Sequence, residues 1–490
     1  MANNNKLKIC LASSEITPLA KTGGLADVVA ALPAYLHGAG HDVRLLVPRY
    51  ARIDNQGLRV EPVRNLQNLT MRIGSWDVSY SIDTTTLPGS GLPIYLLRCP
   101  ELYGRDGIYT QDDDEHLRFI LLSRAAIEMC QRMRFSPHIF HCHDWHTALI
   151  PLYLRCVYSW DKLFTYTKSV LTIHNIGYQG VFPADVLNDL NLGGGVDLLH
   201  QGDLTAGRIN FMKTGVLYAD LLTAVSPRYA HEIQGSEYGA GLDDLLRQRS
   251  DTVIGILNGV DYDAWDPATD KLIPNNYSSA DLSGKAQCKH KLVSDLEILG
   301  GAQRPLVGIV SRLVAQKGIE LIENVLPRLL QQHDFSVAVL GSGERRYEQF
   351  FSQLQNRFRD RVCYYRGYNE KLAHWIEAGA DMFLMPSLYE PCGLNQMYSL
   401  KYGTVPVVRE TGGLADSVEQ INLRTGTGTG ILFRDYNDDA LRWAMNTALD
   451  LFANKRLWRK IIGNGMAMDF SWQRQGEQYV ELFRRLSNVS

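Results

Sequence analysis

Short apolar runs alternate with amphipathic helical patterns along most of the chain, and this alternation restricts the possible fold more than any other feature. The run LKICLA at 7–12 is followed by a helical pattern and then by HDVRLLVPRY at 41–50, which predicts a β-α-β unit. Alternation of this kind favours a mostly parallel sheet covered by helices on both faces. Further strands are expected at 94–99, 139–143, 169–174 and 221–226, and helices around 116–133, 146–158 and 204–219.

A polar stretch at 261–285 interrupts the alternation. It is rich in turn-forming residues and has no hydrophobic period, so we interpret it as an interdomain linker. After Arg304 the alternation resumes, with strand-like runs such as PLVGIVSRL, FSVAVLGSG and DMFLMPS. A chain of 490 residues is also too long for one ordinary hydrophobic core. We therefore expect two α/β domains of comparable size, at 1–260 and 286–468.

Composition and charge restrict the classes of partner. A net charge of -3 argues against a broad nucleic-acid-binding surface. The eight cysteines contain no CxxC pair, which indicates reduced thiols in a cytosolic protein. The N-terminal residues resemble neither a signal peptide nor an import leader, and no apolar run reaches transmembrane length. We expect a cytoplasmic protein without a membrane partner, either bacterial or a trimmed plastid form.

The hexapeptide TGGLAD occurs twice, at 22–27 and 411–416. Each copy follows a strand-like run and opens a helical one, where unpaired N–H groups and glycines favour an anionic ligand. Lys21 directly precedes the first copy, which makes a phosphate site plausible there; the alternative is a solvated surface lysine. The hexapeptide alone is equally typical of a favourable helix start that arose twice.

Three histidines, a cysteine and an aspartate lie close together in HCHDWHTALI at 141–150. Side chains of a strand over 139–143 would alternate between its faces, and no second Cys/His cluster completes a zinc site. Asp144 and His146 at the end of this strand suit a ligand site, the alternative for Asp144 being a helix cap. His174 ends the strand-like run LTIH in the same way, or is an ordinary buried histidine.

Two cations follow the strand-like run GIV in the second half. Arg312 and Lys317 could clamp a diphosphate, the arginine as a planar fork and the lysine as a point charge. The alternative is that both are solvated side chains beside a helix start. No Walker-type P-loop and no Ser-His-Asp arrangement are present in the sequence.

The stretch EPCGL follows another strand-like run, FLMP. Glu390 is a candidate ligand for sugar hydroxyls or a candidate catalytic carboxylate. The amides of Gly393 and Leu394 open the next helix and could meet a phosphate. Cys392 lies at the same helix start, but nothing requires it to act as a nucleophile.

In their order along the chain, these segments resemble bacterial glycogen synthases and plant starch synthases, which are retaining ADP-glucose glucosyltransferases of glycosyltransferase family 5. The resemblance runs from residue 8 to about 433 and implies the GT-B fold, with two Rossmann-like domains facing across a deep cleft that closes on the substrate. It also implies that 469–490 forms a helix crossing back to the N-terminal domain. The segments that carry it are KTGGLADVVAALP, HCHDWHTALIP, TIHNIGYQG, LLTAVSPRYAHEI, GILNGVDYDAWDP, VSRLVAQKG, EPCGLNQMYSLKYGTVPVVRETGGLADSV and GTGILF.

The resemblance also implies roles for individual residues. Tyr368 matches the position that packs on the adenine, Glu390 the position that contacts glucose hydroxyls, and His174 the position near the sugar's 6-hydroxyl and reacting carbon. The implied catalytic set is Glu390, His174, Arg312, Lys317 and Lys21. The implied substrate-binding set is Lys21, Gly23, Gly24, Asp144, His174, Asn258, Arg312, Lys317, Tyr368, Glu390, Cys392, Gly393 and Leu394. The segments GYNE and EPCGLNQM depart slightly from the family's commoner versions.

The implied reaction transfers glucose from ADP-glucose to the non-reducing end of an α-1,4-glucan with retention, without metal or cofactor. Cations and helix amides would stabilise the departing ADP. Double displacement and same-face attack both give retention, and the lack of an evident carboxylate nucleophile favours the second. Alternatives are a UDP-glucose-dependent or sucrose-type synthase of the same fold, an inactive glucan-binding protein, and a glucan phosphorylase, whose pyridoxal phosphate motifs are absent.

Overall fold

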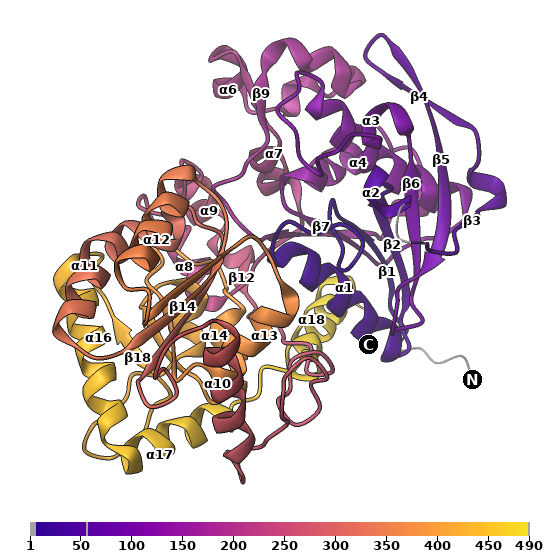
Figure 1. Cartoon of the computed structure of the whole chain (residues 1–490). Helices are drawn as coiled ribbons and strands as arrows, with labels where there is room; N and C mark the ends of the chain where they lie inside the picture. The colour runs from indigo at the N-terminus through magenta and orange to yellow at the C-terminus, as the bar shows by residue number, and fades with distance from the viewer. Residues whose placement is uncertain (1–5, 55–56, 489–490) are drawn as a thin grey trace. The chain divides into compact units, whose positions relative to one another are not determined.

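The computed structural model describes residues 6–54 and 57–488, and these separate into two units (Figure 1). The first unit contains the residues up to Gly259 and those from Trp472 onward. The second unit contains Val260–Ser471. Each unit has its own large sheet with helices around it, so the predicted α/β class is confirmed.

The sheet of the first unit is parallel from β12 to β6 and antiparallel at its far edge. The strand order is β12-β11-β8-β7-β1-β2-β6-β5-β3, with β4 pairing with β5. The antiparallel edge between 61 and 86 was not predicted from the sequence. The strands are β1 Lys8–Ala12, β2 Asp42–Pro48, β3 Glu61–Pro62, β4 Leu69–Ile73, β5 Trp76–Thr86, β6 Pro93–Arg98, β7 Ile139–His143, β8 Lys168–Ile173, β11 Leu221–Ala224 and β12 Val253–Gly255.

Of the helices predicted for the first unit, 116–133 agrees with α4 (Glu115–Arg132), whereas only part of 146–158 is α-helical, as α5 (Ile150–Arg155). The helix predicted at 204–219 is wrong. That segment is not one helix, because Gly207 adopts a left-handed φ of 73° and β10 (Arg208–Asn210) then pairs with β9 (Val181–Pro183). The Asn210 side chain accepts the N–H of Lys213 and starts a new helix. The helices are α1 Gly24–Gly38, α2 Ala51–Asp54, α3 Pro100–Tyr103, α4 Glu115–Arg132, α5 Ile150–Arg155, α6 Gln201–Thr205, α7 Phe211–Tyr218, α8 Pro227–Glu232 and α9 Asp243–Gln248.

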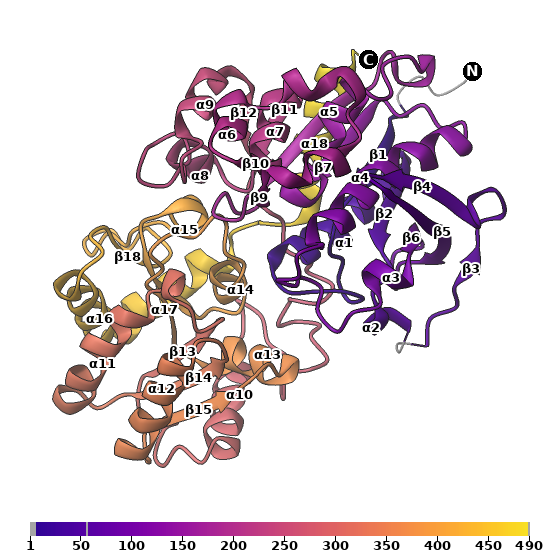
Figure 2. The ribbon, with the colours of Figure 1, turned by 90° about the horizontal axis from the view of Figure 1, so that it is seen from above.

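The C-terminal helix α18 (Trp472–Ser487) belongs to the first unit and lies beside α1 (Figures 1 and 2). The two helices approach closely at Gly476, where an added Cβ would lie 2.2 Å from the ring of Tyr35. The buried rings of Tyr479 and Phe483 contact His141 on β7. The last helix therefore completes the core of a domain whose other residues come from the first half of the chain.

All strands of the second sheet are parallel, in the order β15-β14-β13-β16-β17-β18. Figure 1 shows α11 and α16 on one side of this sheet and α10 and α13 on the other. The strands are β13 Leu306–Val310, β14 Ser336–Gly341, β15 Val362–Arg366, β16 Met382–Met385, β17 Val405–Arg409 and β18 Ile431–Phe433. The helices are α10 Ser283–Asp295, α11 Ile319–Gln332, α12 Arg345–Arg357, α13 Glu370–Gly379, α14 Asn395–Lys401, α15 Gly412–Ser417, α16 Asp438–Ala453 and α17 Lys455–Met466.

The polar stretch 261–285, interpreted above as a linker, lies within the second unit. The Trp265 ring stacks between His374 and Tyr398, with ring centroids 3.7 and 3.9 Å away. The buried carboxylate of Asp270 bonds His374 and accepts the Tyr402 hydroxyl. These contacts hold the stretch against α13 and α14. Among the described residues, no helix is long and apolar enough to cross a membrane.

Candidate active site

Four of the predicted site positions follow the ends of parallel strands in the first sheet. Asp144 follows β7, His174 follows β8, and Asn258 comes after β12. The loop that carries Lys21 leaves β1, which pairs with β7. Because parallel strands end at the same edge of a sheet, these residues share the edge at which α/β proteins bind ligands.

Asp144 is buried and holds the backbone of the next strand's end. Its Oδ1 accepts the N–H groups of His174 at 2.7 Å and Asn175 at 3.4 Å. Burial raises the pKa of this carboxyl from 3.8 to about 7, against the opposing effect of those two N–H groups. Its backbone adopts a φ of 53°, an unusual conformation for a non-glycine residue and one found often at functional sites.

Replacing Asp144 with asparagine is expected to change how stability depends on pH. Because the folded protein holds this proton up to about pH 7 and the unfolded chain releases it near 3.8, wild-type stability falls as pH rises between those values. Asparagine keeps the accepting oxygen and has no proton to lose. The advantage of the variant in urea unfolding should therefore grow from pH 5 to 7, by at most about 1.4 kcal/mol per unit, and then level off. A difference between the two proteins that is independent of pH would contradict the raised pKa.

His174 is buried and its imidazole contacts a second histidine. Its Nε2 lies 3.0 Å from Nδ1 of His143, the last residue of β7. Burial lowers the pKa of His143 to about 3, and burial, with His143 and His146 nearby, holds the pKa of His174 well below its usual range. Both rings are therefore neutral at physiological pH. His143 was not among the predicted site residues, although the two-residue period of a strand places it on the same face as His141.

The first TGGLAD copy holds an internal carboxylate at its helix start. The buried side chain of Glu15 accepts the amides of Thr22 at 2.5 Å and Gly23 at 3.3 Å, as well as the Thr22 hydroxyl. The Gly23 amide is therefore occupied in this structure. Lys21 is partly exposed and pairs with Asp27 at 2.7 Å. Glu15 escaped the sequence analysis, since an acid seven residues before a glycine pair is not a recognised motif.

Asn258 is buried, and its Oδ1 has no hydrogen-bond partner within residues 6–54 and 57–488. An enclosed amide oxygen without a partner is costly unless something else satisfies it. The role of Asn258 at a ligand site stays a prediction, and this oxygen is the atom that a ligand would satisfy.

The second sheet brings the predicted cation pair and carboxylate to its carboxyl edge. Lys317 donates to Glu390 Oε2 at 2.6 Å, and the buried Ser387 hydroxyl donates to the same oxygen at 3.0 Å. Arg312 is exposed, and its guanidinium has no ion-pair or hydrogen-bond partner in the part of the chain that the structure describes. Lys317 is therefore already bound to the Glu390 carboxylate, and Arg312 is available for a ligand.

Gly393 and Leu394 form the turn before α14. Neither amide donates a hydrogen bond to another described residue. Gly393 has a φ of 71°, and the Gln396 side chain fixes the turn by donating to the carbonyls of Cys392 and Gly393. Cys392 is buried, so its backbone shapes the turn while its thiol is shielded. The contact of these two amides with an anion stays a prediction, for which both N–H groups are available.

The second TGGLAD copy packs against the loop that leads into this turn. Gly412 and Gly413 open α15 directly against the backbone of the EPCGL loop, and the Gly413 amide donates to the Glu390 carbonyl at 3.1 Å. An added Cβ would lie 2.0 Å from the Glu390 oxygen at Gly412 and 2.1 Å from the Cys392 oxygen at Gly413. The two copies thus differ in use, because one helix start accommodates an internal carboxylate and the other packs against a loop.

Tyr368 follows β15 at the same edge of the second sheet. Its side chain is 71% exposed, which is unusual for a large aromatic ring. Its role of stacking on a base stays a prediction, for which the ring is accessible.

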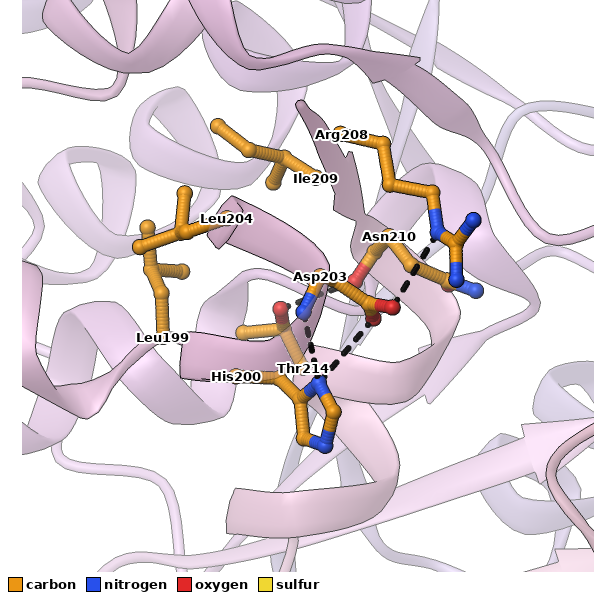
Figure 3. A pocket seen from close by; sticks show the side chains of 8 residues that line it. All are labelled: Leu199, His200, Asp203, Leu204, Arg208, Ile209, Asn210 and Thr214. Atoms are coloured by element: carbon orange, nitrogen blue, oxygen red, sulfur yellow. Dashed lines mark hydrogen bonds and ion pairs between the residues drawn. The ribbon is translucent and has the colours of Figure 1, made fainter. Parts of the chain in front are cut away.

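A separate polar pocket in the first unit is structural (Figure 3). Its volume is about 10 Å³, which is room for roughly one water. The buried carboxylate of Asp203 is bound there by Arg208, Lys213 and His200 at 3.1, 2.7 and 3.3 Å. Its charge is already compensated, and the pocket contains none of the predicted site residues.

Comparison with known proteins identifies both halves of the chain. The starch synthase catalytic domain matches residues 8–248, and the glycosyl transferases group 1 family matches residues 299–461. A glycogen synthase of Koribacter versatilis is 44% identical over 99% of this chain and 99% of that protein. Glycogen synthase 1 of Geobacter sulfurreducens is 42% identical over 98% of this chain and 96% of that protein.

Solved structures agree with these matches. The catalytic domain of starch synthase IV from Arabidopsis thaliana, bound to ADP and acarbose, has a TM-score of 0.90 and 33% identity, and the match covers 99% of this chain and 100% of that chain. A sucrose-phosphate synthase from Thermosynechococcus elongatus, at 18% identity and a TM-score of 0.61, shares the fold alone. Because a glycogen synthase 44% identical to this chain and a starch synthase 33% identical to it each match 99% of its length, the chain belongs to the glycogen and starch synthase family of glycosyltransferases.

Proposed function

We propose that this glucosyltransferase transfers glucose from ADP-glucose to the non-reducing end of an α-1,4-glucan with retention of configuration. The observation that carries the proposal is the set of positive groups at the carboxyl edge of the second sheet. Arg312, Lys317 and the amides of Gly393 and Leu394 are the donors that a diphosphate requires. The starch synthase IV structure that this chain resembles holds ADP, which supports the choice of nucleotide.

Charge stabilisation is the main catalytic contribution in this proposal. As the bond to the anomeric carbon breaks, ADP gains negative charge, and preorganised cations and amides stabilise that charge. The exposed guanidinium of Arg312 forms a fork to two phosphate oxygens, while Lys317 supplies a point charge. No step needs a metal, because these groups supply the positive charge that a metal ion would otherwise provide.

Glu390 binds hydroxyls of the donor glucose rather than attacking it. Its Oε2 already accepts from Lys317 and Ser387, and a carboxylate held in this way is a weak nucleophile. The carboxyl of Asp144 is bound to the backbone of His174, and its pKa is raised to about 7. With both carboxylates engaged, we favour same-face attack, in which the departing phosphate accepts the proton of the incoming hydroxyl.

His174 and Lys21 of the first unit are further substrate contacts in this proposal. His174 is a neutral imidazole anchored at both its backbone and its ring, which suits contact with an uncharged sugar. Lys21, whose side chain is 41% exposed, exchanges its partner Asp27 for a phosphate group of the substrate. The glycogen synthases named above are bacterial, and this supports the first of the two locations expected from the sequence, a bacterial cytoplasm rather than a plastid.

The test is transfer of labelled glucose to glycogen from ADP-glucose, with UDP-glucose in parallel and EDTA added to both. We expect strong incorporation from ADP-glucose that EDTA does not reduce. Incorporation from UDP-glucose alone would overturn the proposed donor and favour the UDP-glucose-dependent alternative. No incorporation from either donor, with the protein folded, would favour a glucan-binding protein without activity.

Replacing Tyr368 with alanine is expected to raise KM for ADP-glucose about tenfold while kcat stays within about twofold, because stacking on a base contributes roughly 1–3 kcal/mol to binding. Steady-state kinetics with ADP-glucose measures both constants. The control is Trp443→Ala, which removes another exposed ring, 51% exposed on α16, and should leave KM unchanged. Equal effects of the two changes would contradict a nucleotide contact at Tyr368.

A further inference from the structure

A hydrogen bond joins the imidazoles of His143 and His174 across two neighbouring strands. His143 is the last residue of β7, and His174 follows the last residue of β8, which pairs with β7 in parallel register. Nδ1 of His143 and Nε2 of His174 lie 3.0 Å apart, and both side chains are buried. Because one nitrogen must donate and the other accept, this contact couples the protonation of the two rings.

The hydrogen bond restricts the tautomers to two combinations. Both rings are neutral, so each carries one proton. Either His143 donates from Nδ1 and leaves its own Nε2 bare, or His174 donates from Nε2 and leaves its own Nδ1 bare. In the second combination, Nε2 of His143 must carry a proton.

The surroundings of His143 decide between these combinations. Its Nε2 is enclosed and has no hydrogen-bond partner among the described residues. A buried N–H without an acceptor is rarer and costlier than an acceptor that lacks a donor. The network therefore favours donation from His143, which leaves the proton of His174 on Nδ1. No described residue accepts from that Nδ1, so it is the ring atom left to contact a ligand.

Neighbouring groups hold the His143 ring in place. The His141 ring packs against it with centroids 4.2 Å apart, and Nε2 of His141 is bonded to the Thr172 hydroxyl at 2.7 Å. Thr172 in turn bonds Thr223 on the next strand at 2.6 Å. Asp144, the residue after His143, fixes the backbone N–H of His174. The consecutive residues His143 and Asp144 thus hold the ring and the backbone of His174.

We propose that His143 is a positioning residue that sets the ring orientation of His174 and keeps its proton on Nδ1, so that His174 donates a hydrogen bond to an oxygen of the donor sugar. The sugar contact rests on the proposed function, whereas the tautomer does not. A donor aimed at a hydroxyl orients the glucosyl group, and loss of such orientation lowers kcat more than it changes KM.

The kinetic test compares His143→Phe with His143→Asn in the full chain. Phenylalanine keeps the ring but cannot donate, and we expect kcat to fall about 10- to 100-fold with KM within about twofold. The side-chain amide of asparagine donates from nearly the same place as Nδ1, so kcat should recover to within about fivefold of wild type. His116→Phe is the control, since it removes another buried histidine of the first unit, bonded to Asp189, and should leave kcat unchanged.

A second experiment, in the His174→Ala protein, distinguishes a positioning role of His143 from general damage to the fold. In the His174→Ala protein, His143→Phe should lower kcat less than twofold further, because the ring that it positions is absent. An undiminished loss in that background would show that His143 acts on the fold and would overturn the proposal. Equal losses for the phenylalanine and asparagine variants would overturn it as well.

The tautomer itself is measured by ¹⁵N NMR of histidine-labelled protein, with the His174 signals assigned by their loss in His174→Ala. We expect a protonated Nδ1 in wild type and His143→Asn, and a mixture of tautomers in His143→Phe. A protonated Nε2 in wild type would overturn the proposal. Because this readout needs no substrate, it is distinguishable from a failure of the proposed function, which would show as a wild-type protein that transfers no glucose.

Discussion

Replacing Lys317 with methionine is expected to lower kcat by about 10²- to 10³-fold, the usual loss when one preorganised charge donor is removed. Two consequences add together. The departing diphosphate loses a point charge, and the carboxylate of Glu390, whose side chain is 6% exposed, loses the cation 2.6 Å away. A buried charge left without its partner is costly and would shift Glu390 away from the sugar hydroxyls. Steady-state kinetics with ADP-glucose and glycogen measures the loss.

The control for this experiment is Lys291→Met on α10 of the same unit. Lys291 pairs with Asp295 at the same kind of distance, 2.7 Å, but both side chains are well exposed, at 53% and 41%. Exposed pairs contribute about 1 kcal/mol or less, so activity should stay at the wild-type level. If Lys317→Met kept more than about a third of wild-type kcat, the charge on Lys317 would not take part in the reaction.

Replacing Gly413 with alanine is expected to destabilise the second unit by about 1–3 kcal/mol, as overpacking of a filled interior does. The new methyl would lie 2.1 Å from the Cys392 oxygen and 2.4 Å from its Cα. Both are backbone atoms, so no rotamer change can relieve the clash and the EPCGL loop has to move. A displacement near 1 Å at Glu390 and Gly393 should cost about 10²-fold in kcat/KM.

Gly463→Ala on α17 is the matched control. A Cβ there meets no heavy atom within 4 Å, and alanine in a helix interior is favoured over glycine by about 0.5–1 kcal/mol. Thermal unfolding should therefore show opposite shifts for the two glycine-to-alanine changes, with activity kept only in the control. Wild-type kcat/KM in a folded Gly413→Ala protein would show that the second TGGLAD copy does not position the loop.

The class of fold and the places of most parallel strands were readable from local patterns, whereas the antiparallel edge between 61 and 86 was not. Runs such as LKICLA and PLVGIV are apolar because both faces of a parallel sheet are covered, and their spacing reflects the helices between them. The resemblance in eight ordered segments was enough to identify the family. Local patterns failed at 204–219, where Gly207 and the pairing of β9 with β10 replace a continuous helix.

The internal partners of the site residues were not readable in the same way. The contacts of His143 with His174 and of Gly413 with Cys392 depend on segments distant in the chain, whereas Glu15 lies only seven residues before Thr22 but bonds it through a loop that no recognised motif specifies. The same six letters, TGGLAD, stand in two different environments for that reason. A short motif specifies a helix start through its own backbone preferences, but the segments that fold against it determine whether its amides face a carboxylate or a loop.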